Sequence, residues 1–123
     1  MNVVDSSGWI EYFTAGKNAD FFEKPIRDVE NLLVPAICIY EVFKRLLAER
    51  DEDSALLSVG IMLQGREVEL NHQIAIEAAH LSREMKRAMA DSILLATARL
   101  HNATLWTQDE HFKGIEGVKY IEK

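Results

Sequence analysis

The stretch NVVDSSGWIEYFT, residues 2–14, decides the fold. Its apolar beginning predicts a buried strand over residues 2–5, which ends on the carboxylate of Asp5. From residue 6 the apolar side chains recur at helical spacing, so a helix over residues 6–14 should follow directly. A strand that leads straight into a helix is the pattern that builds a parallel sheet when it is repeated along a chain.

The same alternation continues to the end of the chain. Apolar runs bounded by turn residues predict further strands over 32–34, 66–70, 104–106 and 118–121. Periodic apolar stretches predict further helices over 18–28, 36–50, 51–64, 71–85 and 88–101. Pro25 is expected to interrupt or kink the helix that contains it. The predicted fold is therefore an α/β fold of three layers, α/β/α, with a mostly parallel central sheet.

Length and composition set limits on the class of protein. The 123 residues, 48% of them hydrophobic, predict a single domain, 1–123, with one core. The one cysteine, Cys38, lies in an apolar run and is expected to be buried. No apolar segment approaches the ~18 residues of a membrane span, and the N-terminus lacks the basic region of a signal peptide, so a cytoplasmic protein without a membrane partner is expected.

The net charge of −6 argues against a broad electrostatic nucleic-acid binder. It remains compatible with an enzyme that holds divalent cations in an acidic pocket, because bound metal offsets the local carboxylate charge. A few lysines and arginines near such a pocket would suffice to contact phosphates.

Four carboxylates lie where such a pocket is expected. In parallel sheets ligands bind beyond the carboxyl ends of the strands, and Asp5 and Asp109 both follow predicted strands. Glu41 and Asp91 lie in helices that are otherwise apolar, where an unpaired charge is costly. A shared Mg²⁺ or Mn²⁺ would offset that cost, since both ions accept oxygen ligands.

Each carboxylate also has a structural alternative. Asp5 can cap the helix that follows it, and Asp109 can cap the short turn after it. Asp91 can favour the dipole of its own helix, and Glu41 can pair with Arg45 four residues later. The joint placement of the four favours a metal site, but spacing alone leaves these alternatives open.

Four motifs occur in order along the chain, which are VVDSS at 3–7, IYEV at 39–42, ADSILLATA at 90–98 and ATLWTQDEHF at 103–112. In these motifs, and over essentially its whole length, the chain resembles the PIN domain family. The length is similar to that of VapC-type toxins of type II toxin–antitoxin pairs. The match is weaker over about 15–34 and 51–70, which leaves the choice of substrate and partner open.

The resemblance implies a metal-dependent endoribonuclease with a PIN-like fold. Its four acids would bind Mg²⁺ or Mn²⁺ and support RNA cleavage; they match Asp5, Glu41, Asp91 and Asp109. Ser6 and Thr107 match hydroxyl positions that often form hydrogen bonds within the site. The family also implies a homodimer and a cognate VapB-like antitoxin, with DNA bound only indirectly through the antitoxin. Helices over residues 36–63 are the candidate groove for its C-terminal segment, although their apolar stripes can equally be core or a homodimer face.

Basic residues near the acids are candidate contacts for RNA, and a solvated surface role is their alternative. They are Lys44, Arg45, Arg83, Lys86, Arg87 and Lys113. The four histidines, His72, His80, His101 and His111, show no metal-ligand spacing such as HExxH and are interpreted as structural or surface residues.

Two other functions are alternatives to a nuclease. A phosphatase of the haloacid type would need a second aspartate two residues after Asp5, and that position is Ser7. A PIN-like module that binds RNA or a protein without cleavage stays open as the alternative to the nuclease.

Overall fold

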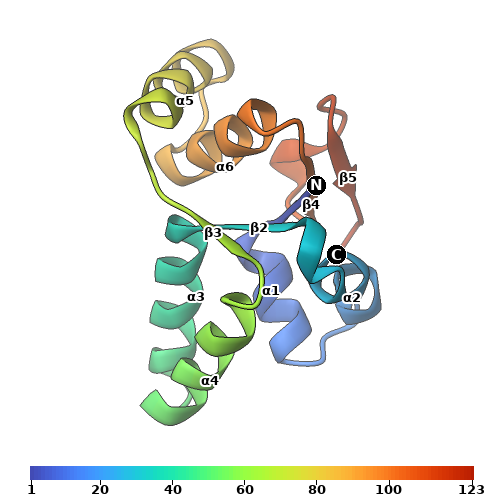
Figure 1. The fold of residues 1–123 in the computed structure, drawn as a ribbon. Coiled ribbons are helices and arrows are strands. Elements are labelled where there is room, and N and C mark those ends of the chain that lie inside the picture. Colours follow the sequence, from blue (N-terminus) through green and yellow to red (C-terminus); the bar gives the residue numbers. More distant parts are fainter.

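The computed structural model describes residues 1–123 and contains a five-stranded sheet and six α-helices (Figure 1). The strands are β1 (Asn2–Val4), β2 (Leu32–Pro35), β3 (Arg66–Val68), β4 (Thr104–Thr107) and β5 (Val118–Tyr120). The helices are α1 (Ser6–Phe13), α2 (Ala19–Arg27), α3 (Ala36–Glu49), α4 (Glu52–Met62), α5 (His72–Met85) and α6 (Met89–Leu100). Two short 3₁₀ helices, η1 (Val29–Asn31) and η2 (Glu110–Phe112), complete the fold.

The strand order is β3-β2-β1-β4-β5, and every neighbouring pair is parallel. Helices α1 to α4 cover one face of the sheet, whereas α5 and α6 cover the other (Figure 1). The predicted three-layer α/β/α fold is therefore confirmed. None of the helices is long and apolar enough to cross a membrane.

The strand order creates a switch point between β1 and β4. From β1 the chain builds outward through β2 to β3, and it then returns to the other side of β1 to form β4 and β5. Val4 pairs with Trp106, and the backbone N–H of Asp5 donates to the carbonyl of Trp106 at 3.0 Å. Connections that leave in opposite directions open a crevice at the carboxyl ends of these two strands, which is where such folds bind ligands.

The core explains why the strands could be recognised in the sequence. Strands buried on both faces must be apolar almost without interruption, and β2 is buried at all four positions. Cys38 is fully buried, as predicted, and its Sγ lies 3.7 Å from the carbonyl oxygen of Val4. Burial raises the pKa of the Cys38 thiol, so the group stays a neutral part of the core.

Two details of the prediction were wrong. Strand β3 ends at Val68 rather than at residue 70, because the chain already turns there toward the start of α5. Helix α2 is not interrupted at Pro25 but continues to Arg27. Pro25 is buried within α2, where its missing N–H removes a single backbone hydrogen bond.

Candidate functional site

Asp5 lies at the switch point and is held by two hydroxyl groups. Its carboxyl oxygen Oδ2 accepts hydrogen bonds from Thr107 Oγ1 at 2.8 Å and from Ser7 Oγ at 3.2 Å. Thr107 Oγ1 in turn accepts the backbone N–H of Asp109 at 3.0 Å. One hydroxyl on β4 therefore links the acid after β1 to the acid after β4. The Asp5 side chain makes no capping bond to α1, so the structural alternative does not account for its position.

Glu41 is tied to the same crevice through Ser6. Ser6 Oγ, at the start of α1, donates to Glu41 Oε1 in α3 at 2.7 Å. The alternative pairing of Glu41 with Arg45 does not form, because Arg45 Nε instead contacts Glu49 Oε1 at 2.6 Å. The half-buried Glu41 thus has a hydroxyl as its partner and no basic group.

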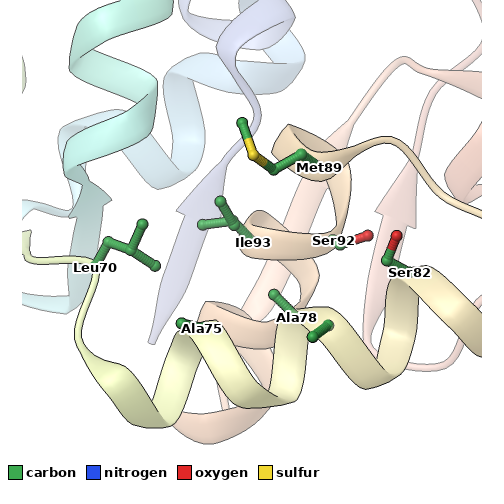
Figure 2. A pocket seen from close by; sticks show the side chains of 8 residues that line it. Leu70, Ala75, Ala78, Ser82, Met89, Ser92 and Ile93 are labelled. Atoms are coloured by element: carbon green, nitrogen blue, oxygen red, sulfur yellow. The ribbon is translucent and has the colours of Figure 1, made fainter.

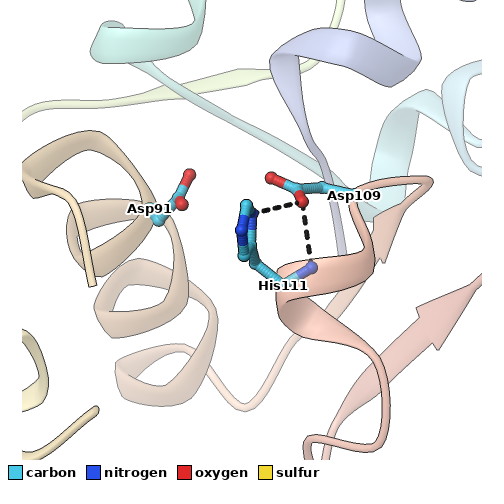
Figure 3. A group of neighbouring side chains, drawn as sticks. All are labelled: Asp91, Asp109 and His111. Carbon is cyan, nitrogen blue, oxygen red and sulfur yellow. Dashed lines mark hydrogen bonds and ion pairs between the residues drawn. The ribbon is translucent and has the colours of Figure 1, made fainter. Parts of the chain in front are cut away.

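Asp91, Asp109 and His111 form a compact cluster, in which one ligand atom of each lies within 4.8 Å of the others (Figure 3). Asp109 Oδ1 accepts the backbone N–H of His111 at 3.0 Å and lies 2.8 Å from His111 Nδ1. Asp109 therefore does cap η2, as its structural alternative expected, and this cap also fixes its carboxylate opposite Asp91.

His111 is predicted from the sequence to be a structural or surface residue, because the histidines show no metal-ligand spacing. It is exposed, which agrees with a surface position, but its ring lies between the side chains of Asp91 and Asp109 (Figure 3). The sequence feature that could have indicated its place in the site is its position two residues after Asp109, within the motif at residues 103–112.

The acids are close enough to repel one another. Burial raises the pKa of Asp5 to about 6, and the charges of Asp91 and Asp109 add to this shift, whereas the hydrogen bonds from Thr107 and Ser7 oppose it. Burial also raises the pKa of Asp91, and the charge of Asp109 contributes in the same direction.

The residues present fit a hard divalent cation. Ion pairs with Lys or Arg within 4.0 Å form elsewhere, at Arg27–Glu23 and Arg45–Glu49, and none of the four acids takes part in one. Crowded carboxylates without a lysine or arginine partner are what Mg²⁺ or Mn²⁺ would stabilise, because the ion accepts oxygen ligands and removes the mutual repulsion.

The basic residues fall into two groups. Lys44 and Arg45 line a pocket together with Ser6 and Glu41, and Arg87 is close enough to Asp91 for its charge to act on that carboxyl. For the remaining candidates the structure shows no contact with the acids. Arg83 and Lys86 are exposed at the end of α5, and Lys113 lies over the ring of Tyr120.

A buried amide pair supports the segment that carries Asp109. Gln108 is 7% exposed, and its Oε1 accepts a hydrogen bond from Asn18 Nδ2 at 2.9 Å. Asn18 Nδ2 also donates to the carbonyl of Glu122 at 3.1 Å. The sequence analysis did not single out either amide, because the two residues are 90 positions apart.

A separate apolar pocket of about 300 Å³ lies between α5 and α6 (Figure 2). Its lining contains none of the four acids, and only Ser82 and Ser92 add polar groups to it. This pocket therefore belongs to a different surface from the carboxylate site.

Sequence comparison identifies the family. The PIN domain model matches residues 3–118, which is nearly the whole chain. The chain therefore belongs to the PIN domain family, and the resemblance of its four motifs is confirmed. No curated protein sequence gives a significant match.

Solved structures share this fold. The chain is similar to one in a toxin–antitoxin complex from Klebsiella pneumoniae, with 23% identity over 100% of both chains and a TM-score of 0.84. It is similar to VapC20 from Mycobacterium tuberculosis, a toxin that cleaves the sarcin–ricin loop, with 16% identity over 94% of this chain and 95% of that one and a TM-score of 0.77. VapBC2 from Rickettsia felis, bound to a fragment of promoter DNA, matches with 12% identity over 98% and 97% of the chains and a TM-score of 0.76.

Proposed function

We propose that this chain is a metal-dependent endoribonuclease and the toxin of a VapBC-type toxin–antitoxin pair. The observation that carries the proposal is the meeting of Asp5, Asp91 and Asp109 at the β1/β4 switch point without a lysine or arginine in ion-pair contact with them. The similarity in fold to VapC20 and to a chain of a toxin–antitoxin complex supports it.

In this proposal each side chain has a defined task. Mg²⁺ or Mn²⁺ bound here would lower the pKa of a water molecule and stabilise negative charge on the phosphoryl oxygens. Thr107 and Ser7 hold Oδ2 of Asp5, which leaves Oδ1 as the ligand atom, and Ser6 holds Glu41 in the same way. The η2 cap orients Asp109 toward Asp91.

The proposal includes the substrate and the products. Lys44, Arg45 and Arg87, which lie beside Glu41 or Asp91, would neutralise RNA phosphates on either side of the acids. The products would carry 5′-phosphate and 3′-hydroxyl ends.

The direct test is cleavage of a structured RNA by the purified protein and by Asp91→Asn, with Mg²⁺ or Mn²⁺ present. The wild type should cleave and EDTA should stop it, while the variant should lose at least about a hundredfold in rate, because a ligand that holds the metal is removed. Asp20→Asn, an exposed acid in the first turn of α2, is the matched control and should cleave like the wild type.

Equal cleavage by all three proteins would mean that the activity is a contaminant. Metal binding without cleavage by any of them would favour the non-cleaving PIN-like binding module instead.

Two exposed apolar surfaces suit the two proposed protein partners. The first consists of side chains of α3 and α4, namely Tyr40, Leu47, Leu56, Leu57 and Ile61, which are 40–72% exposed. Tyr40 also lines the pocket that contains Glu41, so an antitoxin segment on this surface would reach the acids. The second surrounds the α5/α6 pocket, where Leu70 and Met89 are exposed (Figure 2), and a second copy of this chain is proposed there.

Reciprocal variants separate the two partners. Leu57→Asp should abolish binding of the proposed VapB-like antitoxin, a small protein, because it places a charge in the α3/α4 surface, but should leave the homodimer intact. Leu70→Asp should disrupt the homodimer but should leave binding of the antitoxin intact. Calorimetry with that small protein and mass in solution measure the two effects. Loss of antitoxin binding in Leu70→Asp alone would place the antitoxin on the other surface.

A further inference from the structure

The imidazole ring of His111 lies in contact with Asp109. Asp109 Oδ1 lies 2.8 Å from Nδ1. A neutral imidazole binds metal ions through whichever ring nitrogen carries no hydrogen, Nδ1 or Nε2.

The position of the ring suits the cation of the carboxylate site. One ligand atom each from Asp91, Asp109 and His111 lies within 4.8 Å of the others (Figure 3). Ligands on opposite sides of an octahedral ion bound at about 2.1 Å are separated by about 4.2 Å. Small side-chain rotations would therefore bring all three groups to one ion.

His111 is also free to take this role. Its side chain is 69% exposed, and the contact with Asp109 is the one ion pair it makes. The ring fills no part of the hydrophobic core, so core packing gives no reason for its place between two carboxylates.

We propose that His111 is a nitrogen ligand of the cation held by Asp91 and Asp109, and that it makes this site select first-row transition ions over Mg²⁺. The inference rests on the metal site of the proposed function. Mg²⁺ takes oxygen ligands, whereas imidazole suits transition ions, whose affinity for nitrogen ligands rises from Mn²⁺ to Co²⁺.

The experiment titrates the metal-free protein with MgCl₂, MnCl₂ and CoCl₂ by calorimetry and follows the visible absorption of bound Co²⁺. His111→Asn removes the imidazole from an exposed position outside the hydrophobic core, so the fold is retained. Co²⁺ affinity should fall by about tenfold or more, Mn²⁺ affinity by less, and Mg²⁺ affinity by no more than about twofold. The Co²⁺ spectrum should change, because one ligand is replaced.

His80→Asn is the matched control, since His80 is an exposed histidine on α5 outside the cluster. It should bind all three ions like the wild type. An equal loss for the three ions in His111→Asn would show that His111 only holds Asp109, and unchanged affinities would show that it is no ligand. Either result overturns the inference.

The same titration separates this inference from the proposed function. If the wild type binds none of the ions, the metal site fails and the inference fails with it. If the wild type binds metal and cleaves RNA, while His111→Asn keeps the wild-type preference for Co²⁺ over Mg²⁺, only the inference is overturned.

Discussion

Asp5→Asn should make the metal-free protein more stable above neutral pH and at the same time abolish RNA cleavage. The two effects have one cause, which is that the carboxylate of Asp5 is buried beside Asp91 and Asp109. A negative charge in this position is unfavourable in the folded protein until a cation binds it. Removal of the charge therefore removes both the unfavourable free energy of the buried carboxylate and the metal ligand.

The pH dependence follows from the raised pKa of Asp5. In the folded protein this pKa is about 6, against 3.8 for an aspartate free in water. Below about pH 4 the carboxyl group of Asp5 is protonated in both the folded and the unfolded protein, so it does not lower the free energy of unfolding. Between about pH 4 and 6 the unfolded chain releases this proton while the folded protein still holds it, so the stability of the fold decreases. Above about pH 6 the loss is complete, and a shift of about two pKa units corresponds to roughly 3 kcal/mol.

The variant should keep the local hydrogen bonds. Oδ2 of Asp5 accepts both hydrogen bonds, from Thr107 and Ser7, and an asparagine oxygen can accept the same two. The amide nitrogen would replace Oδ1, which has no hydrogen bond in the structure, and would carry two hydrogens toward neighbouring acids. The gain in stability should therefore not be offset by a lost contact.

Urea unfolding in EDTA at several pH values measures this effect. Wild type and Asp5→Asn should differ little at pH 4, and the variant should be more stable by up to about 3 kcal/mol at pH 8. The exposed Asp20→Asn serves as the control and should stay within about 0.5 kcal/mol of the wild type. Added Mg²⁺ or Mn²⁺ should stabilise the wild type more than Asp5→Asn. A variant less stable than the wild type at pH 8 in EDTA would contradict the argument.

Much of the fold was predictable because the relevant signals are local. Strands buried on both faces are apolar runs, and the helices show their own periodicity, so their order alone indicated a parallel sheet. The rule for strand ends then placed Asp5 and Asp109 at one edge. These inferences needed no knowledge of which side chains meet.

The contacts that shape the site were not predictable, because they join distant residues. Ser6 and Glu41 are 35 positions apart, and Asn18 and Gln108 are 90 apart. His111 owes its place to η2, a helix of three residues that is too short to leave a periodic pattern. The sequence therefore indicated the acids but not the groups that orient them.

Phe112→Ala should destabilise the protein strongly and also weaken the metal site. The Phe112 side chain is fully buried at the end of η2, directly after His111. Removal of a buried phenylalanine ring costs about 3–5 kcal/mol, which is a large part of the roughly 5–15 kcal/mol that stabilises an ordinary domain. The ring is the anchor that holds η2, and with it Asp109 and His111, against the core.

The weaker metal site distinguishes Phe112 from other residues of the core. The guanidinium carbon of Arg87 lies 5.7 Å from the centre of the Phe112 ring, so the same side chain supports a basic group beside Asp91. Loss of the ring should therefore loosen both sides of the acid cluster. In protein that is still folded at low temperature, metal affinity and cleavage should both fall, because the ligands are no longer held in place.

Met62→Ala is the matched control, since Met62 is equally buried but lies at the end of α4, outside the acid cluster. It should cost about 2–5 kcal/mol without a change in the metal affinity of the folded protein. Phe112→Leu should recover much of the stability and the metal affinity, because it refills most of the cavity. Phe112→Ala and Met62→Ala could instead lose the same stability and bind metal with the same affinity. In that case η2 is held by its own Asp109 cap rather than by the core. The positions of Asp109 and His111 then do not depend on the buried ring.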